Sequence, residues 1–168
     1  TPIPRSLALT LYGDLEISRI DEMPPGRLPV VTRQLSRSSR TEIVGKLEEV
    51  IAAGGRAFVV VPAIESEDDD DATMATVAKL AEWLRRALGE SCVGILHGRQ
   101  DGKTKAAAMD DFAAGTTPVL VATTVVEVGV DVPAATLMVV VQANRFGLAQ
   151  LHQLRGRVGR GKTPGECW

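Results

Sequence analysis

This sequence of 168 residues is poor in aromatic residues and cysteine. It contains 2 Trp, 1 Tyr, 3 Phe and 2 Cys. Cys92 and Cys167 form no metal-ligand or C-x-x-C spacing, which excludes a cysteine-based metal site, and we expect no bound metal. Cys92 stands in an apolar run and is expected to be a small core residue, as suits a reducing compartment.

Long apolar runs and a strong net charge are also missing. No stretch reaches the roughly 20 apolar residues of a transmembrane helix, and the N-terminus has no secretory signal, so we expect a cytoplasmic protein without membrane contact. The net charge of -2 excludes a globally basic nucleic-acid binder, so any such binding must be local. The chain begins without Met and ends after a basic segment, and we expect it to be a piece of a longer protein.

The order of apolar segments predicts one α/β domain. Residues 1–35 are punctuated by prolines and predict a connector, whereas residues 36–168 predict the domain itself. Within it, apolar runs typical of buried strands alternate with helical patterns, which indicates a mostly parallel sheet with helices on both faces, a three-layer architecture. The acid-rich run Glu65–Asp71 predicts a solvated loop. The expected strands are Ala57–Val61, Cys92–Leu96, Val119–Ala122 and Leu137–Val141.

Polar residues follow the predicted strands, where ligands of parallel sheets collect. His97, Thr123, Thr124 and Asp131 should therefore lie along one rim. Each also has a plain structural interpretation. The threonines could cap the next turn, Asp131 could be a turn residue before a proline, and His97 could be a packed turn residue.

The segment Gln150–Gly161 is the most basic part of the domain. Gln153, Arg157 and Arg160 are spaced four and three residues apart, so on a helix they would share one face. Arginine presents a rigid fork of donors that matches phosphate oxygens, and a nucleoside triphosphate is the natural partner of such a face. The alternative is a solvated basic helix end.

Two segments look like phosphate-binding loops. Gly156–Thr163 satisfies the Walker A pattern, but helical sequence precedes it and Thr163-Pro164-Gly165 follows, so we reject it. Gly98–Thr104 lies between a predicted strand and a helix but is one residue short. A turn with Asp101 as a helix N-cap and a solvated Lys103/Lys105 pair is favoured there, with a small self-contained P-loop nucleotidase as the alternative.

Taken together, these segments resemble motifs V and VI of the superfamily two helicases, and most closely the RecG family of bacterial branched-DNA helicases. The resemblance covers the whole chain. It implies the second RecA-like lobe, with motifs IV to VI, of a two-lobe motor. The segments that carry it are Thr1–Arg5, Leu11–Pro29, His97–Arg99, Val119–Ala134, Arg145–Leu148 and Gln150–Gly161.

The resemblance implies that ATP and Mg2+ are bound mainly by the first lobe, which is missing here. Arg157 and Arg160 match the motif VI arginines, which would be catalytic by stabilising charge on the β- and γ-phosphates. Gln153, Asp131 and Gly129 match positions on the nucleotide side of motifs V and VI.

The same resemblance implies nucleic-acid contacts. Thr123 and Thr124 match motif V positions that touch the DNA phosphate backbone through hydroxyl and amide groups. His97, Gly98 and Arg99 match the family's H-G-R segment, where the glycine lets the backbone approach phosphate.

For the intact protein, the resemblance implies ATP-driven translocation on double-stranded DNA, which remodels stalled forks and Holliday junctions in repair and recombination. Its partners would be branched DNA and, in the same polypeptide, the first RecA-like lobe and a wedge domain, in the bacterial cytoplasm at the nucleoid. No Walker A motif in valid context and no DExH-type box is present, so we expect this piece alone to be inactive. A transcription-repair coupling translocase and a non-catalytic binding module are the further alternatives.

Overall fold

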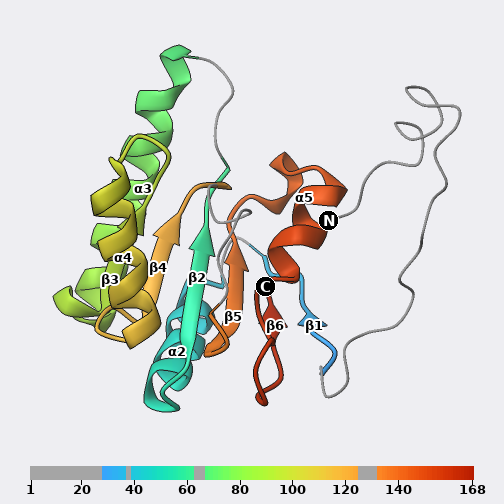
Figure 1. Ribbon diagram of the computed structural model, residues 1–168. Helices are drawn as coiled ribbons and strands as arrows, with labels where there is room; N and C mark the ends of the chain where they lie inside the picture. The colour runs from blue at the N-terminus through green and yellow to red at the C-terminus, as the bar shows by residue number, and fades with distance from the viewer. Residues whose placement is uncertain (1–27, 37–38, 63–66, 125–131) are drawn as a thin grey trace, which may run out of the picture.

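The described part of the chain forms a parallel sheet. The computed structural model describes residues 28–36, 39–62, 67–124 and 132–168, with only the backbone for residues 67–71. Within them, six strands pair in parallel in the order β1-β6-β5-β2-β4-β3, and Figure 1 shows the arrows of β2, β4 and β5 pointing to one edge. The strands are β1 Val31–Thr32, β2 Arg56–Val60, β3 Val93–Leu96, β4 Val119–Ala122, β5 Ala135–Val140 and β6 Glu166–Cys167.

Helices cover both faces of this sheet, which confirms the predicted three-layer α/β architecture. Along β2 the side chains alternate: Ala57 and Val59 pack with α2 and α3, whereas Phe58 and Val60 pack with α4 and α5. The Phe58 and Phe112 rings lie 4.5 Å apart between β2 and α4. The helices are α2 Arg40–Ala52, α3 Glu67–Leu88, α4 Gly102–Ala114 and α5 Leu148–Arg155, with short 3-10 turns η1 Glu90–Cys92 and η3 Ala143–Arg145.

The side chain of Arg56 links the turn between α2 and β2 to α4. Gly54, with φ 72°, ends the helix as the Gly54-Gly55 pair predicts. The Arg56 guanidinium then donates to the carbonyl oxygens of Gly54 (2.6 Å), Phe112 (2.9 Å) and Ala114 (3.0 Å). These bonds join the α2-β2 turn to the C-terminal end of α4.

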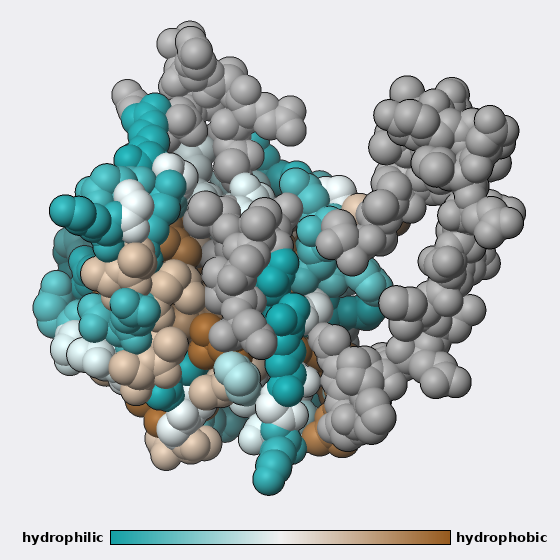
Figure 2. All heavy atoms as spheres, in the orientation of Figure 1, coloured by the Kyte–Doolittle hydropathy of each residue, from teal (hydrophilic) through white to brown (hydrophobic). Residues whose placement is uncertain are grey.

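Figure 2 shows a pale brown area over α4, whose alanines are largely exposed.

Three expectations need correction. Glu67–Asp71 form the first turn of α3 rather than a loop, because acidic residues are favoured at the positive end of a helix. Cys92 is only half-buried, and the buried cysteine is Cys167 on β6. Residues 28–35 of the predicted connector include β1, which joins the sheet beside β6; residues 1–27 lie outside the described part.

None of the described helices is both long and apolar enough to cross a membrane.

Candidate functional site

The ends of β3 and β4 bring two predicted segments together. Leu96 pairs with Ala122, and the amide of Thr123 donates to the carbonyl of Leu96 at 3.3 Å. His97 and Thr123 therefore lie side by side at the carboxyl edge of the sheet, which confirms the predicted rim for these two residues. Asp131 and Gly129 lie outside the described residues.

The threonines offer different groups to a ligand. Thr123 is only 7% exposed, and its amide is hydrogen-bonded to β3. Thr124 is more exposed than Thr123. The resemblance implies phosphate contacts through hydroxyl and amide groups. At Thr123 the amide is not available for such a contact, because it is hydrogen-bonded to the Leu96 carbonyl.

The H-G-R segment forms an open turn after β3. A Cβ built on Gly98 meets nothing within 4 Å, so the backbone there is accessible to a ligand. Burial, and then the positive charges of Lys105 and Arg99, lowers the pKa of His97 below its usual 6.5. A neutral His97 brings no charge to a phosphate at pH 7, so the exposed Arg99 is the charged group of this turn.

The phosphate-loop lookalike Gly98–Thr104 is a helix-capping turn. Asp101 accepts hydrogen bonds from the Thr104 amide (2.9 Å) and the Thr104 hydroxyl (2.8 Å), which confirms the predicted N-cap of α4. Bonds from Thr104 also lower the pKa of Asp101, so a carboxylate stands where a P-loop would receive phosphate. Lys105 is not simply solvated, because its Nζ donates to the Gly98 carbonyl at 2.6 Å.

The predicted shared face of Gln153, Arg157 and Arg160 is wrong. Helix α5 ends at Arg155, so Gln153 is helical whereas Arg157 and Arg160 lie in the loop that follows. Arg160 turns back to donate from Nε to the Gly156 carbonyl at 3.0 Å. Helix α5 is followed by a tight loop, in which Gly159 adopts a φ of 67°.

That loop is fixed by close backbone contacts. The Gly159 amide donates to Ala135 at the start of β5, at 3.0 Å. Cβ atoms built on Gly159 and Gly165 would each lie 2.9 Å or less from the backbone of the other, and one on Gly161 would lie 2.6 Å from the Pro133 carbonyl. The loop that carries Arg160 therefore lies against residues 133–135.

These contacts also exclude the Walker A interpretation of Gly156–Thr163. A helix, α5, precedes this segment and a strand, β6, follows it, which is the reverse of the order that a P-loop needs. The rejection made from the sequence is confirmed.

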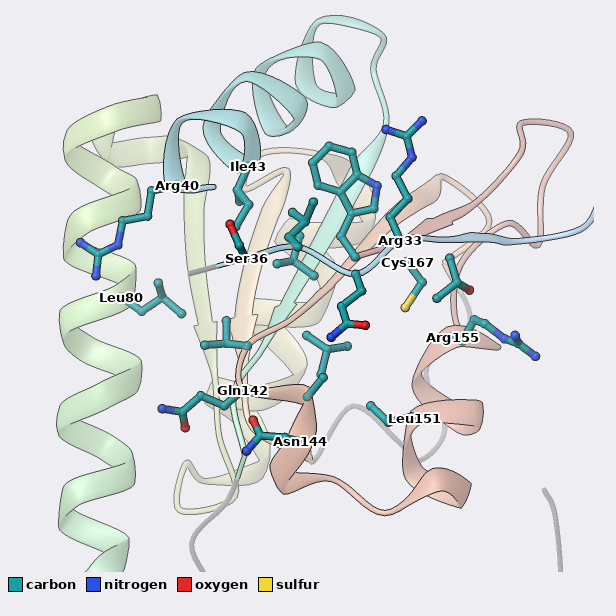
Figure 3. A pocket seen from close by; sticks show the side chains of 18 of the residues that line it. Arg33, Ser36, Arg40, Ile43, Leu80, Gln142, Asn144, Leu151, Arg155 and Cys167 are labelled. Atoms are coloured by element: carbon teal, nitrogen blue, oxygen red, sulfur yellow. The ribbon is translucent and has the colours of Figure 1, made fainter. Parts of the chain in front are cut away.

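A large groove in the described part of the chain has none of the described site residues predicted from the sequence in its lining. It has a volume of about 1140 Å³ and lies between α2 and α3 on one side and α5 on the other, over the end of β5. Figure 3 shows the side chains of Ile43, Leu80 and Leu151 facing it, whereas the guanidinium groups of Arg40 and Arg155 point outwards. No sequence pattern predicts this groove, because its lining comes from separate segments. Its interior is mainly apolar.

Comparison with known proteins identifies the relatives of this fold. The model of the helicase conserved C-terminal domain matches residues 40–162. The ATP-dependent DNA helicase RecG of Acidithiobacillus ferridurans is 49% identical over 167 residues, which are 99% of this chain and 24% of that protein. RecG of Thermotoga maritima is 45% identical over 169 residues, 100% of this chain and 21% of that protein.

Solved structures of helicases also match this chain. RecG bound to a three-way DNA junction superposes with a TM-score of 0.80 and 44% identity, covering 99% of this chain and 21% of that one. Dbp5 of S. cerevisiae, bound to RNA and ADP BeF3, is 20% identical with a TM-score of 0.59 over 84% of this chain and 34% of its own, a likeness of fold alone. The chain spans about a quarter of the length of its RecG relatives.

Proposed function

Because this chain belongs to the family of helicase conserved C-terminal domains, we propose that it is the second motor lobe of a RecG-type ATP-dependent DNA helicase. The intact protein would couple ATP hydrolysis to movement on branched double-stranded DNA. It would thereby remodel stalled forks and Holliday junctions during repair and recombination. The likeness to a RecG bound to a three-way DNA junction supports branched DNA as the partner.

One structural observation carries this proposal. Thr123 is paired with the end of β3 at the carboxyl edge of the sheet, and Ala135, twelve positions further along, accepts a hydrogen bond from the arginine-bearing loop. One chain segment thus joins the candidate DNA contacts to the candidate nucleotide contacts. A motor needs such a link, since nucleotide binding has to move the DNA-binding groups.

The nucleotide site would be completed by the first lobe, which would hold most of the ATP and its Mg2+. Arg157 and Arg160 would approach the β- and γ-phosphates from the second lobe and stabilise charge during transfer. Gln153, Asp131 and Gly129 would contact the nucleotide. Alone, the chain lacks a Walker A loop in its described residues and is expected not to hydrolyse ATP.

The nucleic-acid site would lie at the carboxyl edge of β3 and β4. The Gly98 backbone, the Arg99 guanidinium and the hydroxyls of Thr123 and Thr124 would contact phosphates, with His97 packed behind them. These contacts would position a strand without reading its sequence.

The proposal is tested by Arg157→Ala in the full-length protein. DNA-stimulated ATP hydrolysis should fall about a thousandfold or more, as expected for a lost arginine finger, while affinity for a branched DNA changes little. Arg86→Ala is the control, because Arg86 is exposed on α3 and pairs with Glu82.

Near-normal turnover in Arg157→Ala would remove the catalytic role from this arginine. ATP hydrolysis by the isolated chain, lost on Lys103→Ala, would instead support a self-contained nucleotidase and contradict the two-lobe motor.

A further inference from the structure

Strand β3 is the last strand of the described sheet, with β4 on one side only. The Leu96 carbonyl faces β4, since it accepts from the Thr123 amide. Peptide groups alternate in direction along a strand, so the Ile95 carbonyl and the His97 amide face the open side. Without a partner there, the end of β3 and the turn after it would be held from one side.

A side chain takes the place of the missing neighbour. The Gln100 Oε1 accepts from the His97 amide at 3.0 Å, and its Nε2 donates to the Ile95 carbonyl at 3.1 Å. The Gln100 side-chain amide therefore pairs with β3 as the N–H and C=O of one residue in an adjacent parallel strand would. Its own backbone amide closes the turn by donating to the His97 carbonyl at 3.3 Å.

Two further features tie this turn to α4. Lys105 donates to the Gly98 carbonyl at 2.6 Å, and Asp101 caps the helix directly after the turn. Gly98 and Arg99, in contrast, are exposed on the outside of the turn. The bonds of Gln100 and Lys105 thus hold the inner side of the turn and leave its outer side open.

We propose that Gln100 is a positioning residue for nucleic-acid binding: its side-chain amide fixes the His97–Arg99 turn on the open edge of β3, with Lys105 supporting the turn from α4. The proposal rests on the proposed function, because it assumes that Gly98 and Arg99 contact a phosphate backbone. A neutral amide is required, since the bond to His97 needs an acceptor and the bond to Ile95 needs a donor.

A fixed turn should strengthen binding without changing the chemical step. Ordering the turn before DNA arrives removes an entropic cost from binding. ATP turnover at saturating DNA would depend on the arginine-bearing loop, which lies against the amino end of β5 rather than at the carboxyl edge of β3. Loss of Gln100 should therefore raise the DNA concentration needed for half-maximal ATPase activity and leave kcat nearly unchanged.

The test measures binding of a fluorescently labelled three-way DNA junction to the full-length protein by anisotropy, together with DNA-stimulated ATPase kinetics. Gln100→Met keeps the length of the side chain and removes both hydrogen bonds, and it should weaken binding about three- to tenfold. Gln100→Glu keeps the acceptor but sets an oxygen against the Ile95 carbonyl, so it should not restore binding. Gln34→Met, at an exposed position before α2, is the matched control and should bind normally.

A double-mutant cycle with Arg99→Ala separates positioning from a general structural effect. If Gln100 acts through the turn that presents Arg99, the loss caused by Gln100→Met should shrink in the Arg99→Ala background. Should Gln100→Met fail to fold, Lys105→Met removes the independent bond to Gly98 and should weaken binding in the same way.

Normal DNA binding by Gln100→Met, additive effects in the cycle, or a fall in kcat with an unchanged half-saturating DNA concentration would each overturn the positioning role. The proposed function fails separately: the wild-type protein would then show no DNA-stimulated ATPase activity, or Arg99→Ala would bind DNA normally.

Discussion

Replacement of Gly165 by alanine should disrupt the arginine-bearing loop through sterics alone. A Cβ at Gly165 would lie 2.8 Å from the Gly159 amide nitrogen, 2.9 Å from its Cα and 3.1 Å from the carbonyl carbon of Val158. All three neighbours are backbone atoms, so no flexible side chain can move aside. The φ of Gly165 is not in the left-handed region, so the cost comes from contact rather than from backbone strain.

The magnitude follows from the packing of these backbones. Overpacking of this kind costs about 1–3 kcal/mol of unfolding free energy. Gly45→Ala is the matched control, because the same methyl group on α2 meets nothing within 4 Å. That replacement should stabilise the fold by about 0.5–1 kcal/mol, since alanine favours the helix interior over glycine. The two variants should therefore change stability in opposite directions.

Urea unfolding of the 168-residue chain, followed by the fluorescence of Trp83 and Trp168, measures both changes. In the full-length protein, Gly165→Ala should also lower ATPase turnover, because the displaced loop carries Arg160. Unchanged stability in Gly165→Ala, or equal shifts in the two glycine variants, would refute the close contact between the backbones of Gly159 and Gly165.

Two further predictions concern the stability of the fold. Arg56→Met should cost about 2 kcal/mol in urea unfolding, because it leaves the carbonyls of Gly54, Gly55, Phe112 and Ala114 without their charged donor; the exposed Arg86→Ala should change little. The Nζ of Lys46 lies 2.6 Å from the Oε1 of Glu166. Partial burial raises the pKa of Glu166, but hydrogen bonds from Lys46 and Trp168 outweigh this effect, so the pKa lies below its usual 4.5. A lowered pKa means that the stabilisation is present above pH 4.5 and is lost as the pH falls through the folded-state pKa. Glu166→Gln should therefore lose about 1 kcal/mol at pH 7, and its difference from wild type should close in acid unfolding titrations.

The core of the fold could be predicted because its signals are local and strong. Apolar runs such as Val119–Ala122 are buried on both sheet faces, so burial alone selects their residue types. Gly54 and Asp101 mark helix ends by the conformations and hydrogen bonds that these residue types allow. The two-residue strands β1 and β6 were missed, because strands this short have no periodic pattern and depend on pairing with distant segments.

The candidate site could be predicted in position but not in detail. Strand ends located the rim of His97 and Thr123, since parallel pairing sends all strand ends to one edge. The spacing of Gln153, Arg157 and Arg160 would place them on one face of a helix, but the helix ends at Arg155, before the two arginines of this set. The course of the loop after this helix depends on Gly159 lying against Gly165, a contact between backbones that residue spacing cannot predict.

The path from β4 to β5 explains how one lobe could couple two sites. These strands are parallel but not adjacent, because β2 lies between them. The chain therefore leaves the carboxyl edge at Thr123 and has reached the amino end of β5 by Ala135, where the arginine-bearing loop is attached. In the proposed motor, a phosphate that draws Arg160 towards the first lobe would pull on Ala135 through the hydrogen bond from the Gly159 amide. Because β4 and β5 are both fixed in the sheet, that force would move the lobe as a rigid body and carry the His97–Arg99 turn with it.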